Sequence, residues 1–386
     1  MKFIKTYIDK IQSSFKSSKN SDEIMFKDEN FLSLTPEEHY NLALSFAQNP
    51  QDLSQYKKAL AHYTQAALHG HEYAQFNLAL IYFSKEDKHY DIEKAIKYFL
   101  MAAEQGNEKA QFQLGVIYSS GEHYPPDYAK SRAYYESSIE KEHPEALFNL
   151  GLMYFYGHGV VIDEAKAHEY FERSALYNMP GALYMCAETF FRGRVVPRDI
   201  PKAIEYYEAA AELGNASAQN MLGVIYMHGE GVPTDMRKAE EYLVASAAQG
   251  DVESMFILGV FYERGYLGSN DYFKAKYYYE LAACQGHVVA HYNLGCMFTS
   301  GLGVEQDFEK ACRYYEFAAA RNNASSCFNL AIIYEYGDGG VEIDLLKAEQ
   351  LYQTACENGN QDACKCYKRL SLTRLNKLKR SNQKKV

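Results

Sequence analysis

The chain has 386 residues, of which 47% are hydrophobic and 23% are charged, and its net charge is −10. These proportions are typical of a soluble globular protein. Nine of the 40 basic residues but none of the 50 acidic ones follow Asp362, so the preceding part holds 31 basic residues against 50 acidic ones. We expect this acidic body to repel nucleic acid and to favour a basic partner. No apolar run approaches the ~20 residues that a membrane span needs.

Residues 1–15 predict a short amphipathic helix, which we interpret as an N-terminal cap or extension. A membrane-surface helix is the alternative, although this segment has only three lysines and no tryptophan. The segment lacks the continuous apolar core of a secretory signal. Thr35-Pro36-Glu37-Glu38 then predicts a helix start, with Thr as the N-cap, Pro at the first position and Glu at the third. The first predicted region is therefore the extension 1–35.

A 36-residue pattern begins there and continues almost to the end of the chain. Its most regular feature is an apolar position that recurs at 36-residue steps: Leu42, Leu78, Leu114, Leu150, Cys186, Leu222, Leu258, Leu294 and Leu330. The last copy gains one residue, which places the next counterpart at Tyr367. A period of this length indicates a solenoid of stacked repeats. We expect one elongated repeat domain over residues 36–361.

Each copy predicts two helices. In the first helix a small residue precedes the Leu position by four and an aromatic follows it by four, as in Ala74, Leu78 and Tyr82, so the three share one face. Gly or Ala usually follows the Leu position, and a Gly inside a helix costs about 1 kcal/mol relative to Ala, so close approach of a neighbouring helix is expected. The second helix carries Ala followed by a pair of aromatics, and Gly or Asn ends most copies in the left-handed conformation.

These motifs carry a family resemblance. The pattern A-x-x-x-L-G-x-x-Y-x-x-G, then G-x-G-V, K-A-x-x-Y-Y and A-A-x-x-G-N, resembles the Sel-one-like repeat family, a branch of the tetratricopeptide-like repeats. The copies at Ala146–Val160, Ala218–Val232 and Ala290–Val304 show it clearly. The resemblance covers about nine repeats. It implies a right-handed all-α superhelix of helix pairs that serves as a protein-binding scaffold.

The same resemblance bears on one cysteine pair. Cysteine-rich members of the family form disulfides between cysteines eight residues apart, as Cys356 and Cys364 are. Those members carry such a pair in most repeats, whereas this chain has it in one. A disulfide at Cys356–Cys364 is therefore one expectation, and small buried free thiols are the other.

The chain ends in a predicted helix over residues 363–379, within a C-terminal region of 362–386 that also holds a basic tail. We expect Leu370, Leu372, Leu375 and Leu378 to cover the open end of the array, as terminal repeats must.

No set of residues predicts catalysis or a cofactor. The G-x-G-V loops follow helices rather than strands and lack a Walker lysine, so we interpret them as helix stops and not as nucleotide sites. Cys284, His287, His291 and Cys296 have the residue types of a zinc site, but their positions in the repeat point the side chains in different directions. We therefore predict no metal site, no cofactor and no enzyme.

The candidate binding residues lie one position before the Leu position. They are Asn41, Asn77, Gln113, Asn149, Met185, Met221, Ile257, Asn293 and Asn329. Asn is a poor helix former, so its repetition needs a reason. Side-chain amides suit an extended peptide backbone, and asparagines of related repeats line a concave groove. The alternative is that each Asn bonds a neighbouring repeat. The apolar positions would form a pocket between two polar stretches.

We therefore predict a cytoplasmic, monomeric scaffold that holds a partner protein or peptide in its groove. The alternative is a protein whose basic tail docks to an anionic membrane or to nucleic acid while the solenoid carries cargo. The sequence leaves open the identity of the partner and delivery into a host cell.

Overall fold

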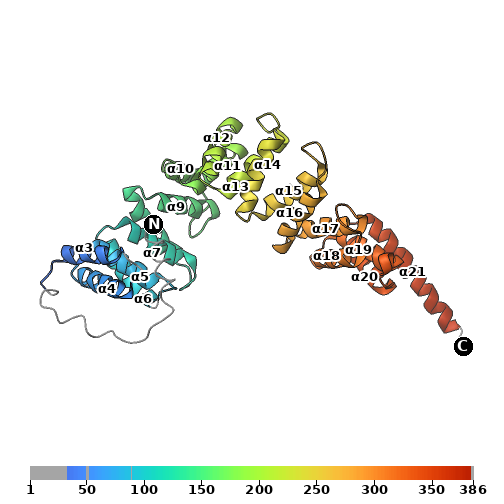
Figure 1. The fold of residues 1–386 in the computed structure, drawn as a ribbon, viewed down its shortest axis with the longest axis horizontal. Helices are drawn as coiled ribbons and strands as arrows, with labels where there is room; N and C mark the ends of the chain where they lie inside the picture. The colour runs from blue at the N-terminus through green and yellow to red at the C-terminus, as the bar shows by residue number, and fades with distance from the viewer. Residues whose placement is uncertain (1–32, 49–51, 88, 384–386) are drawn as a thin grey trace. The chain divides into compact units, whose positions relative to one another are not determined.

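The computed structural model describes residues 33–48, 52–87 and 89–383, with side chains described as far as Leu375. Within these residues the chain forms 19 α-helices, two short 3-10 turns and no strand. Successive helices pack as antiparallel pairs, which confirms the predicted all-α solenoid (Figure 1). The chain divides into two compact units, residues 1–198 and residues 199–386. The amphipathic helix predicted over residues 1–15 lies outside the described residues.

The first unit contains the helices of repeats one to four and the first helix of repeat five. They are α3 (Pro36–Phe46), α4 (Leu53–Leu68), α5 (Glu72–Phe83), α6 (Ile92–Glu104), α7 (Glu108–Ser120), α8 (Tyr128–Ser138), α9 (Pro144–Tyr156), α10 (Glu164–Ala175) and α11 (Pro180–Arg192), with a 3-10 turn at Ile139–Lys141. The capping box predicted at the start of α3 is present, because the Glu38 backbone N–H donates to Thr35 Oγ1 and the Thr35 N–H donates to the Glu38 carboxylate.

The second unit continues the same alternation of first and second helices. They are α12 (Ile200–Glu212), α13 (Ala216–His228), α14 (Met236–Ala248), α15 (Val252–Arg264), α16 (Tyr272–Cys284), α17 (Val288–Ser300), α18 (Phe308–Ala319), α19 (Ala324–Tyr336), α20 (Leu345–Glu357) and α21 (Gln361–Gln383), with a 3-10 turn at Asp338–Gly340. The predicted left-handed helix stops are confirmed here too; Gly214 and Gly250 have φ of 83° and 95°.

The second helix of each repeat begins at an aspartate that the sequence reasoning did not single out. The side chains of these residues accept backbone N–H groups of the first helical turn: Asp52, Asp91, Asp127, Asp163, Asp199, Asp235, Asp271, Asp307 and Asp344. Such a cap stabilises a helix by about 1 kcal/mol. Because the aspartate recurs, it sets the residue at which the second helix of each repeat starts. It thereby sets how that helix is aligned with the first helix of the pair.

The glycine after the Leu position is required by close packing. A Cβ atom added at Gly259 would lie 2.3 Å from Cδ1 of Tyr279, and one added at Gly151 would lie 2.4 Å from Cε1 of Phe171. Tyr279 and Phe171 are fully or almost fully buried. The predicted close approach of a large side chain to a small one is therefore confirmed.

The last helix differs from the prediction. α21 runs to Gln383, and of the leucines expected to cover the open end only Leu370 packs against the last core cluster. Leu372 and Leu375 are 61% and 50% exposed, so the prediction was wrong for these two. The side chain of Leu378 lies outside the described residues. α21 has 23 residues and α20 has 13, so its second half extends past its partner helix.

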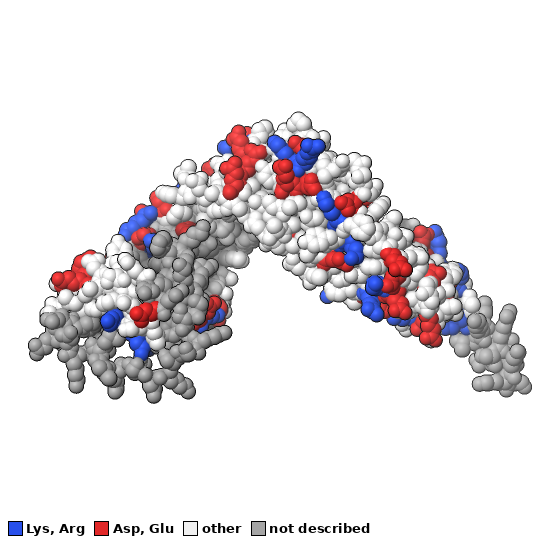
Figure 2. Space-filling view, viewed as in Figure 1, with Lys and Arg blue, Asp and Glu red and all other residues white. Residues whose placement is uncertain are grey.

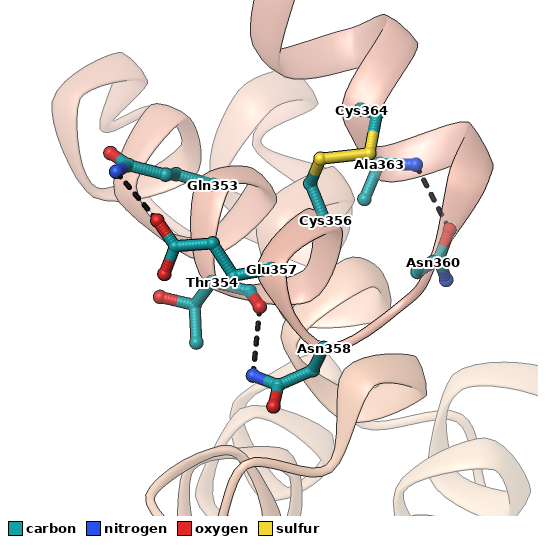
Figure 3. The surroundings of a disulfide bond; sticks show 8 residues. All are labelled: Gln353, Thr354, Cys356, Glu357, Asn358, Asn360, Ala363 and Cys364. Carbon is teal, nitrogen blue, oxygen red and sulfur yellow. Dashed lines mark hydrogen bonds between the residues drawn. A yellow bond between two sulfur atoms is a disulfide. The ribbon is translucent and has the colours of Figure 1, made fainter.

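Other contacts hold α21 in place. Cys356 of α20 and Cys364 of α21 form a disulfide across the turn between the two helices (Figure 3). Nη2 of Arg369 donates to both carboxylate oxygens of Glu335 on α19, at 2.6 and 2.7 Å. Cys284, Cys296, Cys312, Cys327 and Cys366 are free thiols.

Candidate functional site

The predicted binding residues all lie on first helices, each next to the Leu position, which is buried in every copy except at the half-buried Leu42. Asn41 is exposed and the other eight are half-buried. The five positions from Asn41 to Met185 belong to the first unit, and the four from Met221 to Asn329 belong to the second. We call these nine positions the column. In each unit the column forms a partly accessible stripe along the first helices, so the site is described for each unit separately.

The asparagines make specific contacts with tyrosines. The amide of Asn149 donates to the hydroxyl of Tyr135 at 3.1 Å, and that of Asn329 donates to the hydroxyl of Tyr315 at 3.2 Å. Burial raises the pKa of Tyr135, and the bond from Asn149 acts in the opposite direction. A buried hydroxyl without a partner costs about 1–3 kcal/mol, so these amides stabilise the contact between one repeat and the next.

A spacing of 14 residues accounts for much of this arrangement. Asn149 follows Tyr135 by 14, and Asn293 and Asn329 follow Tyr279 and Tyr315 in the same way. Asn293 also bonds Tyr279.

Where the earlier residue lacks a hydroxyl, the later one can be apolar: Met185 follows Phe171, and Ile257 follows Leu243. Gln113 after Phe99 and Met221 after Tyr207 depart from the rule. This spacing is the sequence signal that would have identified the structural contact.

The structure thus supports the alternative in which the asparagines bond a neighbouring repeat. Asn41 and Asn77 differ in detail, since Asn41 contacts Glu37 at 3.3 Å and Asn77 bonds Tyr40. The described contacts use the amide N–H groups of Asn149 and Asn329, and leave their carbonyl oxygens for another donor. Binding of a peptide by this column stays a prediction.

The apolar part of the column is well defined in the second unit. Met221 and Val224 of α13 are both half-buried, as are Ile257 and Val260 of α15. The two helices lie side by side, because the amide of Asn220 donates to Oγ of Ser254 at 2.6 Å. We call these four side chains, Met221, Val224, Ile257 and Val260, the apolar patch. It offers aliphatic surface on the face of the first helices.

A second recurrent feature, which the sequence reasoning missed, links each first helix to its second helix. A lysine in the first turn of the second helix lies over the aromatic ring four residues after the Leu position; Lys166 Nζ is 4.2 Å from the ring centre of Tyr154, and Lys347 Nζ is 4.1 Å from that of Tyr334. A contact of this kind stabilises the pair by about 0.5–1 kcal/mol at exposed sites. These lysines are therefore committed to the fold.

Three of the four residues with zinc-ligand chemistry, His287, His291 and Cys296, make contacts of their own. Nδ1 of His287 accepts the backbone N–H of Ala290 at 3.1 Å, and the ring of His291 stacks on Phe317 at 3.7 Å. The sulfur of Cys296 lies 3.4 Å from the hydroxyl of Tyr315. In the part of the chain that the structure describes, no group of three or more metal-ligating side chains comes together.

The described helices also include none that combines the length and the apolar character needed to cross a bilayer.

Comparison with known proteins gives a consistent result. The family model described as Sel1 repeat matches residues 39–71, 72–107, 108–143, 144–176, 180–215, 216–251, 252–287, 288–323 and 324–360. The chain is similar to the crystal structure of c5321, a protective antigen present in uropathogenic Escherichia coli strains displaying an SLR fold. The identity is 32% and the TM-score 0.73, over 79% of this chain and 65% of that one.

A Sel1 repeat protein from Oxalobacter formigenes is similar at 25% identity with a TM-score of 0.61, over 93% of this chain and 99% of that one. This chain thus spans about two thirds of the length of c5321 and nearly all of the Oxalobacter protein. No curated protein matches.

Proposed function

This chain belongs to the Sel1 repeat family, whose members are generally protein-interaction scaffolds rather than enzymes, and we propose that it binds a partner protein or peptide on the face formed by its first helices. The observation that carries the proposal is the half-buried column beside the Leu positions. Its members pack well enough to be held in place and remain accessible enough to contact a ligand.

The column offers two kinds of contact. The carbonyl oxygens of Asn149 and Asn329 can accept N–H groups of a peptide backbone. The apolar patch can bury aliphatic side chains, and full burial of one such side chain contributes about 1.5–3 kcal/mol. The array buries the remaining faces of its helices on itself, so we propose that it binds its partner as a monomer.

Site-specific photocrosslinking in native lysate tests this proposal. A benzoylphenylalanine would replace Met221 in one variant and Arg313 in the other, because Arg313 is exposed on the second helix α18. We expect a defined protein to crosslink at position 221 and not at position 313. Ile257→Glu, introduced beside the probe at 221, should lower the yield about tenfold, since it places a charge in the apolar contact.

Equal crosslinking at both positions would contradict the proposal. It would show that contacts at the first-helix face are no more specific than those at an unrelated surface. A circular dichroism spectrum of the Ile257→Glu variant serves as the folding control, because a half-buried position tolerates substitution better than the buried Leu258 beside it.

A further inference from the structure

The apolar patch is bordered by a histidine and an arginine at one end. His228 and Arg264 are the last residues of α13 and α15, and both are exposed. Each lies seven positions after Met221 or Ile257, which is two helical turns further along the same face. Figure 2 shows that residues other than Lys, Arg, Asp and Glu cover most of the visible surface at the place where Figure 1 labels α13. The second unit therefore places aliphatic surface directly beside positive charge.

Arg264 has no carboxylate partner among the described ion pairs. Its Nη1 lies 3.4 Å from the hydroxyl of Tyr266. The neighbouring carboxylate of Glu263 accepts the hydroxyl of Tyr279 instead. Glu253, at the other end of α15, lies 3.6 Å from Nε2 of His287. Neither acid of α15 thus forms an ion pair with Arg264, and the exposed guanidinium keeps N–H groups for a ligand.

Comparison with repeat five shows what is missing at Arg264. The equivalent residue there is Arg192, which pairs with Glu188, four residues earlier, at 2.5 Å. The positions equivalent to Glu188 are Val224 in α13 and Val260 in α15. In repeat five this helical position therefore holds the glutamate that pairs with the arginine. In repeats six and seven the same position belongs to the apolar patch. In repeat seven, Arg264 therefore has an aliphatic side chain four residues before it, where Arg192 of repeat five has a carboxylate.

We propose that the apolar patch with His228 and Arg264 binds a segment of a partner protein in which aliphatic side chains are followed by an Asp or Glu side chain. This inference rests on the proposed function and specifies the chemistry of the ligand. The aliphatic side chains pack on Met221, Val224, Ile257 and Val260, and the carboxylate pairs with Arg264. A guanidinium can contact a carboxylate through two parallel N–H···O bonds, which gives the charge contact a defined geometry. The acidic body favours basic partners at a distance, but this local site selects an acidic residue.

Selection from a phage-displayed library of random peptides tests the proposal. The full chain would be presented as wild type, as Arg264→Glu and as the matched control Arg313→Glu, which makes the same charge change on the exposed face of α18. Wild type and the control should select peptides with aliphatic residues followed by Asp or Glu. Arg264→Glu should select Lys or Arg at that position instead, because the charge of the site is reversed.

Binding of a selected peptide would then be measured by fluorescence polarisation, with its acid changed to the corresponding amide. The change should weaken binding to wild type about tenfold and leave binding to Arg264→Ala unchanged. Amidation of the C-terminus of the peptide should have no effect. Loss of binding on amidation would overturn the proposal, because the carboxylate would then come from a chain terminus.

Two further outcomes separate this inference from the proposed function. Dependence of a selected peptide on Met221 and Ile257 would be tested by Lys substitutions at both positions. If the peptides depend on these residues but show no preference for an acidic residue, the inference is overturned and the first-helix face remains a binding surface. If no selected peptide depends on Met221 or Ile257, the inference fails, and the crosslinking experiment at position 221 decides the proposed function separately. If sedimentation shows that the chain associates with itself through this patch, a second copy is the occupant and the proposal is overturned.

Discussion

The two ends of the described array solve the same problem in different ways. A terminal helix pair has a neighbouring repeat on one side only, so it lacks part of the burial that stabilises the others. At the C-terminal end, α21 is held by the disulfide Cys356–Cys364 and by the contact of Arg369 with Glu335. At the other end, α3 and α4 are joined by His39 and His62, whose Nδ1 atoms lie 2.8 Å apart.

The difference lies in the kind of interaction. The C-terminal end uses a covalent bond and charged pairs, whereas the N-terminal pair uses rings, with Phe46 stacked on His62 at 5.5 Å between ring centres. Each kind responds to a different perturbation: reductant and loss of charge should affect α21, and acid should affect α3 and α4. Local opening free energies of the two ends, measured by hydrogen exchange, can therefore be changed independently.

Reduction of the disulfide should have the largest effect. Opening the link between Cys356 and Cys364, which are eight residues apart, removes a constraint on the unfolded chain worth about 2.5 kcal/mol by the loop-entropy relation. We expect dithiothreitol to lower the opening free energy of α21 amides by about this amount and to leave α3 and α4 unchanged. Cys284, Cys296, Cys312, Cys327 and Cys366 are free thiols, so we assign the response to reductant to the disulfide of this pair.

The double variant Cys356→Ala with Cys364→Ala should reproduce the effect and remove the response to reductant. Equal loosening of both ends by reductant would show that the comparison is wrong, because the disulfide would then stabilise more than its own end.

Loss of the arginine contact should have the next largest effect. The Arg369→Ala variant leaves the carboxylate of Glu335, whose side chain is 9% exposed, without its cation. Because the arginine itself is half exposed, we expect a loss of about 2 kcal/mol in the stability of α21, below that of a fully buried pair. The hydroxyl of Tyr352, which donates to Glu335 at 2.8 Å, should retain part of the contact.

Lys365→Ala is the matched control, since Lys365 contacts Asp362 at 2.7 Å on the surface of the same helix and both side chains are largely exposed. It should change stability by less than about 0.5 kcal/mol. Similar losses of stability in Arg369→Ala and Lys365→Ala would contradict the prediction. Burial of the Glu335 carboxylate would then not increase the effect of removing its cation.

The sequence predicted the repeated part of the fold well because its determinants recur. A period of 36 residues, small residues opposite large ones, and glycines that end helices are all local in the chain. Gly259 illustrates this, since its predicted role needed only its place next to Leu258, and the structure adds that Tyr279 occupies the space. Such features are the same in every copy, so nine weak signals reinforce one another.

What could not be predicted occurs once or lies between repeats. Glu335 and Arg369 are 34 residues apart, and only the packing of α19 on α21 brings them together. The exposure of Leu372 depends on where α20 begins relative to the end of α21. The contact of Asn149 with Tyr135 could have been found, because its 14-residue spacing recurs in the sequence. The signal is a relation between two repeated positions, and neither position shows it alone.

Acid should have the smallest of the three effects, and at the opposite end. Burial first, and then the charge of His39, lowers the pKa of His62 to about 4 from a usual value of 6.5. The folded state therefore favours neutral His62, and its contribution is complete above about pH 6.5 and is lost as the pH falls toward 4. At pH 5 His62 therefore binds a proton in the unfolded chain and stays mostly neutral in the folded chain.

We expect α3 and α4 to lose about 1.5 kcal/mol of opening free energy between pH 7 and pH 5, while α21 loses less. His62→Phe keeps the ring beside Phe46 and removes the titrating group, so it should abolish the difference between the two pH values. The control His228→Phe, at an exposed position, should leave that difference unchanged. If the acid response of α3 and α4 persists in His62→Phe, groups other than this pair set the pH dependence, and the contrast between a charged end and a neutral end no longer explains it.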